Sequence, residues 1–171
     1  MKRILVVGGT GFIGYHIAKK ALEKKFQVTS ISLKKPKKRR YLRGVKYIFV
    51  DLINYKLLKK KVKGDFEYIV NAGGYGKHIP FSKGGDFIFK SHYFGLQNLV
   101  RAISKKKLKR FVQIGSSAEY GNSAAPQTEK SKCSPKTPYA LAKFMSTNYL
   151  MKLYKTHKFP SVVLRLFSVY G

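Results

Sequence analysis

Short apolar runs alternate with amphipathic stretches along the whole chain, and this alternation limits the available folds more than any other feature. Six runs have the composition of strands, at residues 3–7, 27–33, 45–50, 68–71, 110–115 and 161–167. They lack the regular polar and apolar alternation of half-exposed strands, which is typical of strands buried on both faces of a parallel sheet. Helical periodicity falls between them, at residues 12–25, 54–62, 87–104 and 139–157. We therefore predict an α/β fold, a doubly wound parallel sheet that forms one domain over residues 1–171.

Length and cysteine content agree with this prediction. A chain of 171 residues is long enough for one domain with a buried core. No run approaches the roughly 18 consecutive apolar residues of a membrane span. The basic start MKRILVVGG is interrupted by glycines well before the length of a secretory signal, so no targeting segment is expected. The single cysteine, Cys133, cannot form an internal disulfide and suits a reducing compartment, so we expect a soluble, cytoplasmic protein.

The net charge is the unusual part of the composition, because 36 Lys and Arg residues face seven Asp and Glu residues and give +29. Such an excess raises the affinity for any polyanion, so nucleic-acid binding has to be considered. The lysines are nevertheless spread over nearly every segment, largely where a helix or loop faces water. The densest cluster, KKPKKRRYLR at residues 34–43, resembles a polyanion-binding patch, but we favour a solvated loop. Specific nucleic-acid binding is therefore not expected.

A glycine-rich turn joins the first predicted strand to the first predicted helix, in the sequence ILVVGGTGFIG. Gly8 permits a tight turn, Gly11 lets the backbone approach a pyrophosphate, and Gly14 lets the helix pack closely on the strand. The phosphates would lie over the helix N-terminus, where backbone N–H groups and the helix dipole favour anions. A purely structural turn is the alternative. We predict that these glycines, with Phe12 and Ile13, bind a dinucleotide, and we predict no metal site.

The end of the second strand carries no acidic residue, although the adenosine ribose of NAD is usually held by one there. The sequence VTSISLKK instead offers Ser32, followed by Lys34 and Lys35. A small hydroxyl with nearby cations suits a 2′-phosphate, so NADP is favoured over NAD as the cofactor.

Two further loops follow strands at the same edge of the predicted sheet. In VDL, Asp51 and Leu52 come after the third strand, where Asp51 would meet the adenine or cap the helix that begins near Asn54. In NAGGYG, Ala72 and Gly73 leave room for a cofactor, although such a loop can also be a mere connection. Because the carboxyl ends of parallel strands share one edge, we predict that both loops face the crevice beside the glycine turn.

The stretch TPYALAKF puts a tyrosine four residues before a lysine at the start of the last predicted helix. Thr137 can cap this helix, and Pro138 suits its first position. Tyr139 and Lys143 then lie one turn apart on the same face. The positive end of the helix dipole and the ammonium group both stabilise a phenolate, which suits a tyrosine that acts as a general acid or base. A surface contact between the two side chains is the alternative.

The sequence GSSAEYG, residues 115–121, favours the catalytic alternative. It follows the fifth strand and brings two serine hydroxyls to the same sheet edge, where a serine could donate a hydrogen bond to a substrate oxygen. Serines after a strand are commonly turn residues. Here they occur in order with GGTGFIG and YALAK, so we predict a functional role for Ser116 and Ser117 together with Tyr139 and Lys143.

These motifs together resemble the extended short-chain dehydrogenase/reductase family, and within it the NAD-dependent epimerase/dehydratase branch that works on nucleotide sugars. GGTGFIG, VDL, the NAGG loop, FVQIGSSAEYG, PYALAK and LRLFSVYG occur in family order and at family-like spacing, over essentially all 171 residues. The resemblance implies a Rossmann fold and a nicotinamide cofactor that removes a hydride from a sugar carbon while a tyrosine removes the hydroxyl proton.

Carried onto this sequence, the resemblance assigns the acid/base role to Tyr139. It assigns to Lys143 the tuning of that tyrosine and the binding of the nicotinamide ribose. Counting back from Tyr120 assigns the family's catalytic serine or threonine to Ser116, with Ser117 as a close second. The implied substrate is a nucleotide sugar.

Departures from the family pattern narrow the expected chemistry. Sugar 4,6-dehydratases of the family carry Asp-Glu directly after the catalytic threonine, whereas Ser117 and Ala118 stand here and Glu119 comes one place late. Epimerisation or reduction is therefore favoured over dehydration, unless a one-residue gap restores Glu119. His92 stands where the family commonly has Asn, and we expect a packing or dimer-face residue. Ser168 replaces an Asn that helps to hold substrate, which leaves the sugar open.

Family members usually continue for well over a hundred residues into a smaller lobe that binds the nucleotide part of the substrate. This chain stops after LRLFSVYG, so we expect the C-terminal substrate lobe to be missing and the chain to bind NADP or NAD with little or no turnover. The functions left open are an epimerase/dehydratase-like oxidoreductase, an NADP-dependent carbonyl or sugar reductase, and a non-catalytic dinucleotide-binding protein. Family dimers pair the helices that would be residues 87–104 and 139–157, which implies a homodimer.

Overall fold

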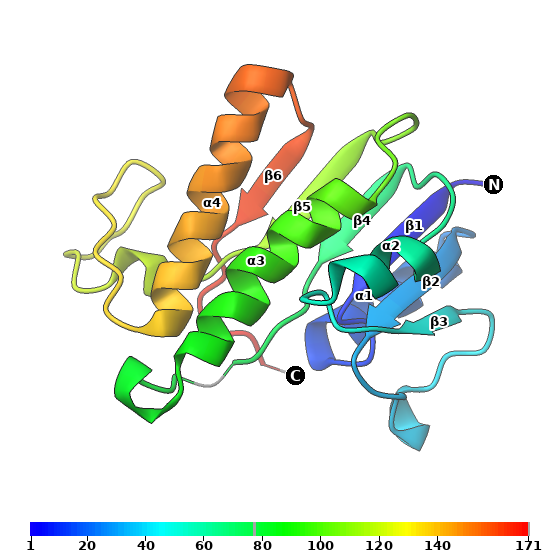
Figure 1. Cartoon of the computed structure of the whole chain (residues 1–171), viewed down its shortest axis with the longest axis horizontal. Coiled ribbons are helices and arrows are strands. Elements are labelled where there is room, and N and C mark those ends of the chain that lie inside the picture. The colour runs from blue at the N-terminus through cyan, green and yellow to red at the C-terminus, as the bar shows by residue number, and fades with distance from the viewer. Residues whose placement is uncertain (77, 171) are drawn as a thin grey trace.

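Parallel strands form one sheet with helices on both of its faces, as seen in a computed structural model that describes residues 1–76 and 78–170 (Figure 1). The strands are β1 (Arg3–Val7), β2 (Gln27–Ser32), β3 (Lys46–Phe49), β4 (Tyr68–Asn71), β5 (Arg110–Ile114) and β6 (Ser161–Leu164). They lie in the order β3-β2-β1-β4-β5-β6, and every neighbouring pair is parallel. The doubly wound parallel sheet predicted from the sequence is confirmed.

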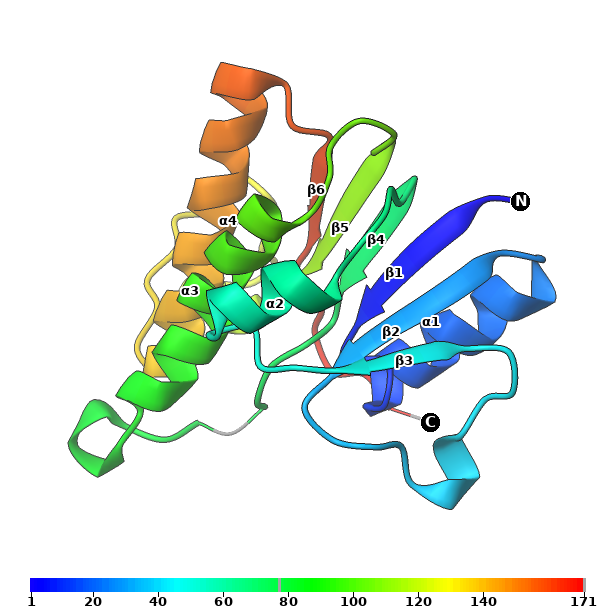
Figure 2. The same ribbon diagram turned by 45° about the vertical axis from the view of Figure 1, so that its right-hand side comes forward.

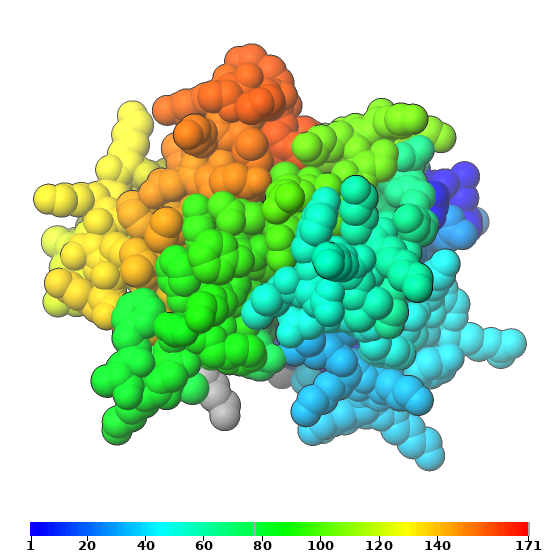
Figure 3. Space-filling model, in the orientation of Figure 1, coloured from blue at the N-terminus to red at the C-terminus, as the bar shows by residue number. Residues whose placement is uncertain are grey.

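The helices cover the two faces of the sheet unequally. The α-helices of the described residues are α1 (Phe12–Glu23), α2 (Tyr55–Lys61), α3 (Asp86–Ala102) and α4 (Pro138–His157), and the 3₁₀ helices are η1 (Lys38–Arg40), η2 (Phe81–Lys83) and η3 (Ser117–Tyr120). Figures 1 and 2 show α1 on one face and α2, α3 and α4 together on the other. In the space-filling view, side chains of the latter three helices cover much of the sheet (Figure 3). Across residues 1–76 and 78–170, no helix combines the length and the apolar character needed to cross a membrane.

Burial on both faces explains why the strands lack polar alternation. Successive residues of a strand point to opposite faces, and both Leu5 and Val6 of β1 have no exposed surface. Leu5 belongs to the larger core cluster, which includes Leu96 of α3. Val6 belongs to the smaller cluster, where β1 and β2 pack against Ala18 and Ala21 of α1. Strand β1 therefore has an apolar side chain on each face, as expected for a sheet covered on both sides.

Capping side chains fix the starts of two helices that border the candidate site. Thr137 Oγ1 accepts a hydrogen bond from the backbone N–H of Ala140 at 3.1 Å, and Pro138 is the first residue of α4, as predicted. Helix α2 is capped by Asn54, whose side chain accepts a backbone N–H of the first turn at 3.0 Å. The alternative that Asp51 caps this helix is therefore wrong.

The last strand is shorter than predicted, because β6 ends at Leu164 and not at residue 167. The carbonyl oxygens of Leu164 and Leu166 accept hydrogen bonds from the backbone of the segment that follows β5, both at 2.8 Å. Between them, Arg165 directs its side chain to Glu119 of η3. The chain thus leaves regular strand geometry in order to follow η3, a helix that the apolar pattern did not indicate.

Candidate active site

A cavity of about 420 Å³ opens at the carboxyl ends of β1, β2, β3 and β4. The strand order reverses between β1 and β4, and the crevice at such a reversal is where open α/β sheets bind ligands. The predicted cofactor residues that line it are Gly8, Gly11, Ser32, Lys34, Asp51, Leu52, Ala72 and Gly73. These residues come from four separate loops, and the parallel sheet brings all four loops to one edge.

The other predicted residues of the glycine turn lie outside this cavity. Phe12 and Ile13 line a separate hollow beside α1 together with Tyr170. Gly14 packs under the turn, where a Cβ atom would overlap the carbonyl oxygen of Gly8. The missing side chain of Gly14 is therefore what allows α1 to approach the turn so closely.

The β2 side of the cavity is basic and hydroxylic. Ser32 and Lys34 both line it, and the Ser32 hydroxyl accepts a backbone N–H of the glycine turn at 3.3 Å. Arg40 of η1 folds back so that its Cζ lies 5.9 Å from the centre of the Phe12 ring, next to the start of α1. Among the described residues, Asp51 is the only acidic one that lines the cavity, and it follows β3 rather than β2.

Tyr139 and Lys143 lie on successive turns at the start of α4 and differ in environment. Tyr139 is partly exposed, whereas Lys143 is only 4% exposed. The Lys143 ammonium donates to the carbonyl oxygen of Ile114 at 2.7 Å and lies 5.6 Å from the centre of the Tyr139 ring. Burial lowers the pKa of Lys143 to about 8, and the charge of Glu119 opposes this shift. The ammonium group therefore lies between the end of β5, to which it donates a hydrogen bond, and the ring of Tyr139.

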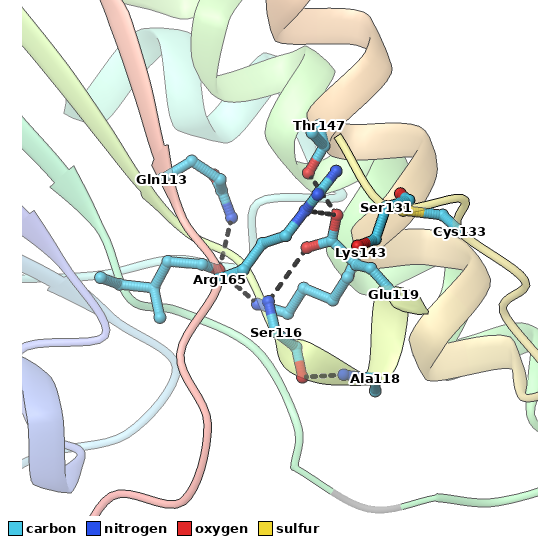
Figure 4. Close-up of polar contacts among 10 residues, drawn as sticks. Gln113, Ser116, Ala118, Glu119, Ser131, Cys133, Lys143, Thr147 and Arg165 are labelled. Atoms are coloured by element: carbon cyan, nitrogen blue, oxygen red, sulfur yellow. Dashed lines mark hydrogen bonds and ion pairs between the residues drawn. The ribbon is translucent and has the colours of Figure 1, made fainter. Parts of the chain in front are cut away.

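The two predicted serines follow the acceptor of Lys143 along the chain and lead into η3. Ser116 Oγ accepts the backbone N–H of Ala118 at 3.2 Å, and the Ser116 N–H donates to Glu119 Oε1 at 3.0 Å (Figure 4). The backbone N–H of Ser117 is bonded to the segment after β6. Both serines are partly exposed, and η3 packs against α4.

Glu119 is held in a buried network that sequence reasoning missed. It has no exposed surface, and its Oε2 accepts hydrogen bonds from Thr147 Oγ1 at 2.7 Å and Arg165 Nε at 3.0 Å (Figure 4). With the Ser116 N–H, it thus binds groups from η3, α4 and the segment after β6. The sequence did contain a signal for part of this network: Ser116 and Glu119 have the three-residue spacing of a capping box. The structure shows this capping box at the start of η3.

Two histidines border the Tyr139 ring. His92 of α3 is 7% exposed, and its ring centre lies 5.2 Å from that of Tyr139. The ring centre of His78 lies 4.7 Å from the same tyrosine. Burial, followed by the charge of Lys143, lowers the pKa of His92 to about 3. Sequence spacing could not reveal these contacts, because α3 and the loop of His78 meet α4 only in the folded chain.

The chain is similar to known proteins over its whole length. The sequence profile of the NAD dependent epimerase/dehydratase family matches residues 4–171. The chain is 25% identical to the dTDP-D-glucose 4,6-dehydratase of Dictyostelium discoideum, over 100% of this chain and 44% of that protein. It is 30% identical to the ADP-L-glycero-D-manno-heptose-6-epimerase of Brachyspira hyodysenteriae, over 98% of this chain and 55% of that protein. The chain therefore spans about half the length of the curated relatives it matches.

Solved structures show the same fold. The UDP-glucose 4-epimerase of Thermotoga maritima with UDP-glucose has a TM-score of 0.88 at 23% identity, over 99% of this chain and 56% of that one. The UDP-glucuronic acid 4-epimerase of Bacillus cereus, in complex with UDP-glucuronic acid and NAD, has a TM-score of 0.82 at 25% identity. That match covers 99% of this chain and 57% of the epimerase chain.

Proposed function

This chain belongs to the NAD-dependent epimerase/dehydratase family, and from that membership we propose that it binds NAD(P) and exchanges a hydride with a sugar carbon of a nucleotide sugar. The observation that carries the proposal is the buried ammonium of Lys143, which lies between the end of β5 and the Tyr139 ring. Burial disfavours the charged form of Lys143, so a reason for the buried ammonium is needed, and stabilising a phenolate at Tyr139 is such a reason.

The residues at the sheet edge fit a dinucleotide. Gly11 is the N-cap of α1 and makes no side-chain capping bond, and the first turn holds no acidic residue. The backbone N–H groups of the first turn of α1 are therefore available to a pyrophosphate over the cavity. When bound, the nicotinamide supplies the hydride chemistry, and the protein supplies position and proton transfer.

The proton steps belong to this chain's own side chains. Tyr139, as a phenolate that the Lys143 ammonium stabilises, would take the proton of a sugar hydroxyl at its phenolic oxygen and become neutral. Returning that proton would restore the phenolate. Ser116 Oγ already accepts the Ala118 N–H, so its own hydrogen is left to donate to the sugar oxygen. Both groups would then contact the same reacting oxygen, which is the arrangement that lowers the barrier for its deprotonation.

The same geometry favours epimerisation or reduction over dehydration. Elimination of water would need a carboxylate free to act as acid or base near the substrate. Glu119 is fully buried and its carboxylate accepts hydrogen bonds from Ser116, Thr147 and Arg165, so it is not free for that role. Even if a one-residue gap aligns Glu119 with the glutamate of the dehydratases, Glu119 is therefore not free to act as the catalytic acid. Without the gap, Ala118 stands at that position and has no acidic group.

The proposal is tested by titrating the purified chain with NADH and NADPH, following nicotinamide fluorescence, and then adding NAD(P)⁺ with UDP-, dTDP- or ADP-sugars. We expect saturable cofactor binding and formation of reduced nicotinamide on the enzyme, with Tyr139→Phe binding cofactor but forming none. Stoichiometric cofactor consumption would instead indicate a reductase. Cofactor binding without any reduction in the wild type would indicate a non-catalytic binding protein, and absence of binding would refute the proposal.

Cofactor choice gives a sharper prediction. We expect NADPH to bind about tenfold more tightly than NADH, because Ser32 and Lys34 line the cavity after β2 and offer a hydroxyl and a cation to a 2′-phosphate. Ser32→Asp should reverse this preference, and Lys34→Ala should weaken NADPH binding several-fold with little effect on NADH. Lys37→Ala is the matched control, since Lys37 is an exposed lysine of the same loop that does not line the cavity. Equal affinities that Ser32→Asp leaves unchanged would contradict the prediction.

A further inference from the structure

The imidazole of His92 fills the space between the loop after β4 and the Tyr139 ring. Its ring is edge-on to that of Tyr139, with an angle of 86° between the planes and 5.2 Å between the centres. On its other side, Nε2 lies 3.1 Å from the backbone nitrogen and 2.9 Å from the carbonyl oxygen of Tyr75. One side chain of α3 thus touches both the loop that lines the cofactor cavity and the candidate acid/base.

The loop after β4 is shaped around this ring. Gly74 has a φ of +131°, a conformation that side chains with a Cβ rarely adopt, and a Cβ there would overlap the His92 ring. Gly74 and Tyr75 both line the cofactor cavity. The imidazole therefore supports the loop from behind, while the front of the loop forms the cavity wall.

His92 can do this without carrying a charge. As an acceptor, Nε2 takes the N–H of Tyr75, and as a donor it bonds to the Tyr75 carbonyl, so either neutral tautomer has a partner on the same residue. A neutral imidazole adds no second positive charge beside the Tyr139 ring, where the Lys143 ammonium already lies. The contact is thus suited to holding positions and not to transferring protons.

We propose that His92 is a positioning residue, which fixes the loop of Gly74 and Tyr75 at the wall of the cofactor cavity and the Tyr139 ring beside it. Two separable contacts carry these roles. The hydrogen bond to Tyr75 sets the loop, and the ring edge sets the orientation of Tyr139. That the ligand of the cavity is a cofactor rests on the proposed function. The contacts of His92 with Tyr75 and with the Tyr139 ring do not depend on it.

A pair of variants separates the two contacts. His92→Gln keeps a polar atom at the distance of Nε2 and loses the ring, whereas His92→Phe keeps a ring and loses the hydrogen bond. Gln97→Ala is the control on the same helix, because Gln97 is partly exposed and contacts neither the loop nor Tyr139 in the described hydrogen bonds. All variants are compared as full chains with the wild type.

The first readout is amide hydrogen exchange of Tyr75, measured without any cofactor. We expect His92→Phe to speed this exchange about tenfold, the effect of one lost hydrogen bond, and to leave the amides of β1 unchanged. We expect His92→Gln and Gln97→Ala to exchange like the wild type. The ring resonances of Tyr139 should shift most in His92→Gln, since only this variant lacks the neighbouring ring.

The second readout is cofactor titration, where His92→Phe should bind NADPH about tenfold more weakly and His92→Gln within about threefold of the wild type. Unchanged Tyr75 exchange in His92→Phe would overturn the inference. If His92→Phe does not fold, His92→Gln decides: protected Tyr75 with shifted Tyr139 resonances supports the inference, and loss of protection overturns it. A wild type that binds neither cofactor but shows the predicted exchange pattern would refute the proposed function and leave the role of His92 intact.

Discussion

Glu119→Ala is expected to lower the free energy of unfolding by about 3–5 kcal/mol, a large part of the stability of a domain of this size. The carboxylate has no exposed surface and accepts hydrogen bonds from three groups that meet only here. Its removal leaves the guanidinium of Arg165, which is 15% exposed, without its ion-pair partner. It also removes the capping box that starts η3. Urea unfolding followed by circular dichroism measures the loss.

Two further variants show whether the buried pair is the cause. Glu129→Ala removes an exposed glutamate from the loop between η3 and α4, and it should change the free energy of unfolding by less than about 0.5 kcal/mol. The double variant Glu119→Leu with Arg165→Met should recover much of the loss, since apolar groups often replace a buried ion pair without a penalty. A loss below about 1 kcal/mol in Glu119→Ala would show that the network does not hold η3 to α4.

The fold and the family could both be predicted, because each is indicated by short local patterns that do not depend on contacts between distant segments. Leu5 and Val6 are adjacent and both apolar, which indicates a strand buried on both faces, and the structure confirms it. Glycine turn, strand ends and tyrosine helix follow one another in the order of the family whose profile matches. Parallel topology alone then brings Ser32 of one loop and Ala72 of another to the same cavity.

The missed features all depend on contacts between distant segments. The ion pair between Glu119 and Arg165 requires the segment after β6 to lie along η3, which no local pattern specifies. The same contact ends β6 at Leu164, so an apolar run predicted as strand becomes irregular. The burial of His92 agrees with the packing expected of it, but its partners, Tyr75 and Tyr139, could not be predicted because they come from a loop and another helix.

Lys143→Met is expected to raise the free energy of unfolding at pH 7 by about 2 kcal/mol and to remove the proposed hydride exchange. Burial lowers the pKa of Lys143 to about 8 from the ordinary 10.5. A separation of about 2.5 between these values corresponds to a penalty of roughly 3 kcal/mol for keeping the buried group charged. Methionine avoids this penalty, but the Ile114 carbonyl loses its hydrogen bond, worth about 1 kcal/mol.

The pH dependence of stability distinguishes this explanation from a simple packing effect. Below pH 8 both the folded and the unfolded lysine are protonated, so the whole penalty is present. Between about pH 8 and 10.5 the folded lysine loses its proton first, so unfolding takes up a proton and the free energy of unfolding rises with pH. The difference between Lys143→Met and the wild type should therefore shrink across this window.

Urea unfolding at several pH values from 6 to about 10.5 measures this difference, with Lys152→Met as the control because Lys152 is an exposed lysine of the same helix. A Lys143→Met protein that is less stable than the wild type at pH 7, or a difference that does not change with pH, would contradict the prediction. If the variant is more stable and inactive, the ammonium at Lys143 lowers stability, and its contact with Tyr139 is explained by proton transfer rather than by folding.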